Sequence, residues 1–225
     1  MSGESNATIS KMLPRAVMII LGLPWPEIVG EMWKTGRKTM RGLSNEGTYE
    51  VLDYETTLEL LDHKGKQASL KKREKVRYLQ NHILAYQDQA WGDGKILLDY
   101  RCTPGKPVDR YRSGYKTHIL ISRREVKNKG DIDEFNIQWN IHQGFLKTHC
   151  YWATEINQRT RKVNVKVYFP KGRPPKRTWI VEKNLQRSIS LEKESIKQLP
   201  NGRWIVSWKK FKPHLYEQYI LNWEW

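Results

Sequence analysis

The sequence contains little cysteine. Cys102 and Cys150 are the only two cysteines among its 225 residues. Two cysteines are too few for the disulfide framework of a small secreted protein, and alone they cannot form a zinc ligand set. We therefore expect both thiols to be reduced and the protein to be cytoplasmic.

Long hydrophobic runs are also scarce. The run at residues 16–23 (AVMIILGL) is far shorter than the roughly 20 residues that a membrane-spanning helix needs. Lys11 and Arg15 precede it, as basic residues precede the apolar part of a signal peptide. No small-residue cleavage site follows it, because the next residues are Pro24-Trp25-Pro26. We expect neither a membrane span nor export from this run.

Acidic residues are in deficit. There are 24 Asp and Glu against 40 Lys and Arg, which gives a formal charge of +16. A positive charge of this size attracts anionic partners, namely nucleic acid, an acidic membrane or an acidic protein. The alternative is that the charge only keeps the protein soluble. Hydrophobic residues at 38% and aromatic residues at 11% exclude a disordered chain and predict a packed core.

Strict alternation of apolar and polar residues marks the strands. In residues 135–141 Phe, Ile, Trp and Ile alternate with Asn, Gln and Asn, and residues 162–169 and 219–225 show the same period of two. Ten to twelve such short runs predict an antiparallel β-sandwich over residues 47–225. We predict that Phe135, Ile137, Trp139, Val163, Val165 and Val167 are core residues.

Several details of this β domain depend on its connections. The break at residues 127–131 lies between two β-type runs and predicts a central hairpin over 115–141. Residues 103–114, with two prolines and two glycines, predict a loop. Residues 67–80 fit either a strand or a helix, because the centre of this segment is highly charged. A division into two packed subdomains, 47–112 and 113–225, is an alternative to a single β domain.

Residues 1–46 have a different character. They begin with a polar tail, and residues 26–43 carry apolar residues at helical spacing between basic ones, which predicts a short amphipathic helix. We favour docking of this helix on the β domain. The alternative is a helix that lies on a membrane surface or binds a partner.

Catalytic motifs are hard to find. The six histidines are scattered, and no established metal-binding, phosphate-binding or nucleophile motif occurs. We therefore expect no metal site and no cofactor. Pro107-Val108-Asp109, an apolar run and Glu125-Val126-Lys127 together resemble the PD-(D/E)xK pattern of metal-dependent nucleases. That resemblance implies that Asp109 and Glu125 hold Mg²⁺ and that Lys127 orients or activates the attacking water.

The most basic segment runs from residue 159 to residue 187, with ten Lys and Arg residues and one acid, Glu182. Phosphates pair with cations and bases stack on rings in proteins that bind single strands. The candidate binding residues are Arg161, Lys171, Arg173, Lys176, Arg177, Tyr168 and Trp179. The competing interpretation is a solvated basic hairpin that protects a sheet edge from aggregation.

The sequence as a whole favours a non-enzymatic, basic β-sandwich module that binds an anionic partner, with nucleic acid first. A protein-interaction or regulatory subunit of a larger intracellular assembly, with an acidic protein as its partner, is the second hypothesis. A Mg²⁺-dependent nuclease built on Asp109, Glu125 and Lys127 is the third. The sequence leaves the ligand and the oligomeric state open.

Overall fold

The computed structural model describes residues 47–191 and 195–225. The predicted helix at 26–43, like all of residues 1–46, lies outside the described residues. The described ranges hold fourteen strands and almost no helix, which confirms the mainly β fold. The strands are β1 (Tyr49–Leu60), β2 (Gln67–Tyr78), β3 (Ile83–Ala90), β4 (Lys95–Thr103), β5 (Lys106–Ser113), β6 (Lys116–Lys127), β7 (Ile132–His142), β8 (His149–Glu155), β9 (Lys162–Phe169), β10 (Arg177–Glu182), β11 (Arg187–Ser190), β12 (Ile196–Gln198), β13 (Trp204–Phe211) and β14 (Gln218–Glu224).

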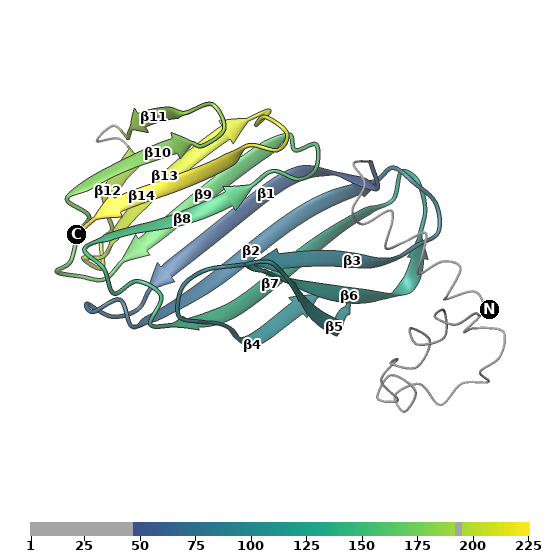
Figure 1. Ribbon diagram of the computed structural model, residues 1–225, viewed down its shortest axis with the longest axis horizontal. Coiled ribbons are helices and arrows are strands. Elements are labelled where there is room, and N and C mark those ends of the chain that lie inside the picture. The colour runs from purple at the N-terminus through teal and green to yellow at the C-terminus, as the bar shows by residue number, and fades with distance from the viewer. Residues whose placement is uncertain (1–46, 192–194) are drawn as a thin grey trace, which may run out of the picture. The chain divides into compact units, whose positions relative to one another are not determined.

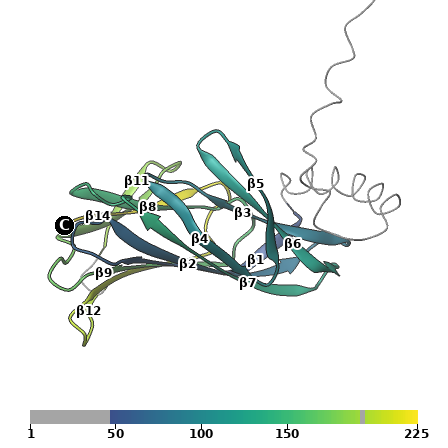
Figure 2. The same ribbon diagram turned by 90° about the horizontal axis from the view of Figure 1, so that it is seen from below.

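These strands form three sheets (Figure 1). The largest has seven strands in the order β12-β13-β9-β1-β2-β7-β4. A second sheet has four strands in the order β11-β10-β14-β8, and a third has three in the order β3-β6-β5. Both smaller sheets lie against the seven-stranded sheet, as the view in Figure 2 shows.

Ring contacts join the layers. Phe169 of β9 meets Trp223 of β14 edge to face at 5.7 Å, and Phe135 of β7 stacks on Tyr86 of β3 at 3.9 Å. Directly opposed residues of neighbouring strands point to the same side of a sheet. A row of opposed residues, Val167, Leu58, Leu70 and Trp139, crosses from β9 to β7. Phe169 and Phe135 are in phase with this row, so both smaller sheets cover one face.

The core fills the space between the layers. The six predicted core residues, Phe135, Ile137, Trp139, Val163, Val165 and Val167, are all buried, which confirms the alternation as a guide to the buried face. Tyr219, Leu221, Trp223 and Trp225 at the end of the chain are buried as well. Aromatic rings supply much of this core, because each buries a large apolar area.

Strand β2 settles the ambiguous segment 67–80. It pairs with β1 on one side and with β7 on the other over its whole length. Lys72 and Glu74 lie on its buried face. These two charged residues interrupt the apolar half of the alternation, which is why the sequence pattern is weak there.

The predicted hairpin over 115–141 is wrong, because its two strands do not pair with each other. Strands β6 and β7 flank the break as expected, but β6 belongs to the three-stranded sheet and β7 to the seven-stranded sheet. The connection carries the chain from one layer to the other. Backbone hydrogen bonds of 2.9 Å join Tyr78 to both Gly130 and Asp131 and hold this corner in place. Strands β9 and β10, which flank residues 170–176 in the basic segment, also lie in different sheets, so they form no hairpin either.

Residues 103–114 are not a loop, because most of them form β5. Every residue of β5 is exposed, and the strand pairs only with β6 among the described residues. A strand without a buried face has no alternation that the sequence could reveal.

One further feature departs from a purely antiparallel sandwich: β1 and β9 run parallel, from Tyr54 opposite Val163 to Glu59 opposite Tyr168.

All described residues belong to one compact unit. Strands that precede residue 112 pair with strands that follow it in both the seven-stranded and the three-stranded sheet. Cys102 and Cys150 are both free thiols. Within residues 47–191 and 195–225, no helix has the length and apolar character that a membrane crossing requires.

Candidate functional site

Three connections and the end of the chain meet at one end of the sandwich (Figure 1). The connections are residues 61–66 between β1 and β2, residues 143–148 between β7 and β8, and residues 170–176 between β9 and β10. We call this region the cationic end. Because β1 and β9 are parallel, the connections that follow them leave the sheet at the same edge.

Backbone hydrogen bonds tie these segments together. The amide of Phe145 donates to the carbonyl oxygen of Gly65 at 3.1 Å, and the amide of Trp225 donates to that of Thr148 at 3.2 Å. The amide of Lys176 donates to the carbonyl oxygen of Glu224 at 2.7 Å. The cationic end is therefore built from segments that lie far apart in the sequence.

Arg173 is the side chain that links most of these segments. Its guanidinium carbon lies 3.6 Å from the centroid of the Trp225 ring, a close cation–π contact. One of its nitrogens, Nη1, also donates to the carbonyl oxygen of His63. The indole N–H of Trp225 in turn donates to the carbonyl oxygen of Lys147 at 3.0 Å. Arg173 thus has a role in holding the loops as well as a charge.

Besides Lys147, five other cations at or next to this end are exposed, namely Lys64, Lys66, Lys171, Lys176 and Arg177. None of them forms an ion pair with an acid in the part of the chain that the structure describes. Arg177 instead lies over the ring of Trp179, at 5.2 Å from its centroid. These charges are consequently available to an anionic partner.

Asp62 is the acid of the first loop, and backbone groups occupy its carboxylate. It accepts hydrogen bonds from the amides of Lys64 at 2.7 Å, Gln67 at 2.5 Å and Lys66 at 3.2 Å. Burial raises the pKa of this carboxyl, but the backbone hydrogen bonds outweigh it and hold the pKa below its usual range. Asp62 therefore shapes the loop while remaining charged.

The outer face of the seven-stranded sheet differs, because acids pair with several of its cations. Strand β1 lies between β2 and β9 and contributes acids to that face. The ion pairs are Arg73–Asp53 (2.6 Å), Lys162–Asp53 (3.0 Å), Lys166–Glu55 (3.1 Å), Arg161–Glu50 (3.3 Å), Arg77–Glu50 and Arg203–Glu59. Burial raises the pKa of Asp53, but hydrogen bonds from Arg73 and Lys162 bring it below its usual value. These six cations are thus neutralised, whereas the five exposed cations named above have no acidic partner among the described residues.

The structure divides the predicted binding residues into two groups. Lys171, Arg173, Lys176 and Arg177 lie together at the cationic end. Arg161 lies at the other end of β9, which at about 3.3 Å per residue places it roughly 25 Å away, and it pairs with Glu50.

The two predicted stacking rings face opposite sides of the sandwich. Tyr168 alternates with buried residues of β9, so it lies on the outer face of the seven-stranded sheet, beneath the guanidinium of Arg203 at 5.7 Å. Trp179 lies on the outer face of the four-stranded sheet and packs on His149, with ring centroids 5.0 Å apart. Trp179 therefore lies beside Arg177 of the cationic end, whereas Tyr168 lies on the opposite face of the sandwich.

Sequence reasoning missed Lys64, Lys66, Lys147 and His149 as members of this site. The loop containing Lys64 and Lys66 is recognisable as a turn. Its position beside residues 170–176 depends on the parallel pairing of β1 with β9, for which no local pattern exists.

The residues of the nuclease-like pattern do not come together. Asp109 on β5 lies opposite Leu120 of β6, five residues before Glu125, which corresponds to about 17 Å along an extended strand. Glu125 is 74% exposed and pairs with Lys127 at 3.1 Å. Lys127 also approaches Asp133 to 3.6 Å. No group of three or more acidic, histidine or cysteine side chains placed to hold a metal occurs among the described residues.

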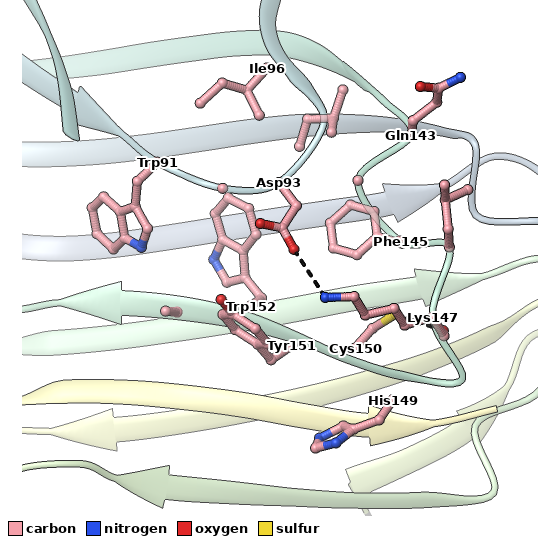
Figure 3. Close-up of a pocket in the computed structure, with 15 residues that line it drawn as sticks. Trp91, Asp93, Ile96, Gln143, Phe145, Lys147, His149, Cys150, Tyr151 and Trp152 are labelled. Atoms are coloured by element: carbon pink, nitrogen blue, oxygen red, sulfur yellow. Dashed lines mark hydrogen bonds and ion pairs between the residues drawn. The ribbon is translucent and has the colours of Figure 1, made fainter. Parts of the chain in front are cut away.

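A pocket of about 180 Å³ opens beside the cationic end (Figure 3). The turn between β3 and β4, the connection between β7 and β8, and strand β8 form its walls. Trp91, Ile96, Phe145, Cys150, Tyr151 and Trp152 give it a largely apolar lining. Lys147 and Asp93 also line it and form an ion pair, with Nζ and Oδ2 3.6 Å apart.

No protein family model matches this chain, and no curated protein matches it either. Among solved structures it is similar to a protein from Parabacteroides distasonis named as a "putative protease", with a TM-score of 0.49, 6% identity, and coverage of 80% of this chain and 41% of that one. It is also similar to the M1 zinc metallopeptidase from Deinococcus radiodurans, with a TM-score of 0.44, 10% identity, and coverage of 80% and 43%. The chain spans less than half the length of either structure.

Proposed function

We propose that this protein is a binding module that holds single-stranded nucleic acid at the cationic end. The supporting observation is the convergence of exposed cations without ion-pair partners from residues 61–66 and 170–177. Phosphates dominate the affinity of basic proteins for nucleic acid, because each contact releases condensed counterions. The proposal includes a cytoplasmic location, in keeping with two free cysteines.

The character of the cationic end favours a single strand over a duplex. Tyr151 is 52% exposed and Trp179 is partly exposed beside Arg177, so this surface presents rings as well as cations. Bases of a single strand stack on such rings while their phosphates pair with Lys and Arg. Within the described residues this end consists of loops and strand ends, and no helix is present there to enter a major groove.

The decisive experiment measures how binding of a fluorescent dT8 oligonucleotide depends on salt. Replacing Lys64, Lys66, Lys171 and Lys176 with Gln removes four exposed cations that make no ion pair in the described structure. Each phosphate contact contributes about −0.7 to the slope of log affinity against log salt, so we expect the slope to flatten by about 2 to 3 units.

A matched control separates local contacts from net charge. Lys106, Arg110, Arg124 and Lys129 are exposed cations of β5, β6 and the corner that follows β6, away from the cationic end. Replacing these four with Gln lowers the net charge equally, and we expect the salt slope to change by less than about 1 unit. Equal slopes for the two quadruple variants would contradict the proposed site. Absence of dT8 binding by the unmodified protein at low salt would contradict the function and favour an acidic protein as the partner.

A further inference from the structure

The pocket beside the cationic end combines an apolar interior with a cationic rim. Trp91, Phe145 and Trp152 contribute rings to its wall, and Figure 3 shows the indole of Trp152 drawn between the other two. Lys147 and His149 also line the pocket. A ligand that matches both parts has a flat apolar ring and a nearby negative charge.

The rim is close to further cations. The amide of Gln143, a lining residue, donates to the carbonyl oxygen of Lys66 at 2.6 Å, which places the first loop of the cationic end beside the pocket. The side chains of Lys147 and Asp93 are 80% and 67% exposed, so their ion pair is worth little and is readily replaced. Lys147 is therefore free to move to a phosphate at the mouth of the pocket.

Trp152 supplies the polar group that selects the ring. Its indole nitrogen Nε1 is buried and has no hydrogen-bond partner within the described structure. Leaving a buried donor unpaired is unfavourable, so a small turn of the indole that brings this N–H to an acceptor on a ligand would be favoured. By contrast, the neighbouring indole of Trp225 already donates to the carbonyl oxygen of Lys147.

The volume limits the size of the ring. An apolar cavity of about 150 Å³ is enough to hold a benzene molecule, and pockets for drug-sized ligands start at about 300 Å³. At about 180 Å³ the pocket suits one six-membered heterocycle. Uracil, thymine and cytosine are such rings, and each carries a carbonyl oxygen that accepts a hydrogen bond.

We propose that this pocket takes one unstacked pyrimidine base of the bound strand. The indole N–H of Trp152 donates to a carbonyl oxygen of the base, the rings of the wall enclose it, and Lys147 meets the adjoining phosphate. This inference rests on the proposed function and adds to it a preference for pyrimidines. It assigns the base to the pocket and the backbone to the cationic end.

The test compares dT8, dA8 and an eight-residue abasic oligonucleotide that carries the phosphates without bases. We expect the unmodified protein to bind dT8 about 10-fold more tightly than the abasic strand and more tightly than dA8. Trp152→Phe keeps an aromatic ring and removes the N–H, so most of the preference for dT8 should disappear while the salt slope stays unchanged. Trp223→Phe is the matched control, because Trp223 has an equally unpartnered buried Nε1 and does not line the pocket.

A second variant guards against misfolding of the first. Ile96 is partly buried on the pocket wall, and Ile96→Trp should fill the pocket and abolish the preference for dT8 without touching any hydrogen bond. Equal affinities of the unmodified protein for dT8 and the abasic strand would overturn the pocket assignment and leave the cationic end as proposed. Equal affinities for dT8 and dA8 would overturn the pyrimidine preference. Failure to bind any of the three strands would overturn both proposals.

Discussion

Lys72 of β2 donates to the carboxylate of Asp88 of β3 in the interior between two sheets, where 7% and 0% of the two side chains are exposed. Asp88 also accepts a hydrogen bond from the hydroxyl of Tyr100 at 2.9 Å. Burial lowers the pKa of Lys72, but the charges of Asp88 and Glu74 outweigh it and raise the pKa well above its usual value. The lysine is therefore charged inside the protein.

Removing one member of this pair should destabilise the fold strongly. We expect Lys72→Met to cost about 3 to 5 kcal/mol, because it leaves buried carboxylates without their cation. The double variant Lys72→Met/Asp88→Asn should recover part of that loss. Urea unfolding of the three proteins measures both effects. Lys166→Met, which breaks a partly exposed pair with Glu55, is the control and should cost at most about 1 kcal/mol.

Glu74 should make stability depend on pH. Burial raises the pKa of its carboxyl above 4.5, against the opposing charge of Lys72, and its Oε2 is buried without a hydrogen-bond partner among the described residues. The folded protein then holds this proton more tightly than the unfolded chain does. The contribution to stability is full below about pH 4.5 and is lost as the pH rises through the folded pKa.

Glu74→Gln should remove the loss of stability that accompanies ionisation of Glu74 as the pH rises. We expect the free energy of unfolding of the variant to be less dependent on pH above about pH 4.5 than that of the unmodified protein. Urea unfolding between pH 4 and pH 8 provides the comparison. Parallel profiles for the two proteins would show that Glu74 ionises in the folded state as it does in the unfolded chain.

We expect Arg173 to matter because its side chain orders residues 170–176, and not because it carries a positive charge. Arg173→Lys keeps the charge but loses the flat guanidinium that lies on Trp225 and donates to His63. We expect amide exchange in residues 170–176 to accelerate by about 10-fold and the salt slope of dT8 binding to stay within about 1 unit. Lys176→Arg serves as the control and should leave the exchange rates unchanged.

The sequence predicts which residues are buried better than it predicts which strands are neighbours. Phe135, Trp139 and Val165 are recognisable because an alternating strand has one apolar face. The same alternation arises whether the next strand lies in the same sheet or in the facing layer. This is why the sequence predicts hairpins around residues 127–131 and within the basic segment 159–187, where the chain in fact crosses from one layer to the other.

The candidate site was only partly predictable for the same reason. Local charge density identifies Lys171, Arg173, Lys176 and Arg177, which the fold keeps together. It also includes Arg161, because a strand of eight residues separates it from the loop in space while the sequence shows one continuous basic segment. Lys64 and Lys66 join the site through a pairing between distant strands, which no short-range pattern encodes.

The parallel pairing of β1 with β9 also sets the order in which the protein can fold. Asn164 of β9 donates to Glu55 of β1 at 3.0 Å across 109 residues of chain. Closing so long a loop is entropically costly and slow, so the large sheet is completed late. Until β9 arrives, the hairpin of β1 and β2 has a free edge that can pair with another chain. The growing polypeptide therefore exposes this edge of β1 at least until residue 169 has been synthesised.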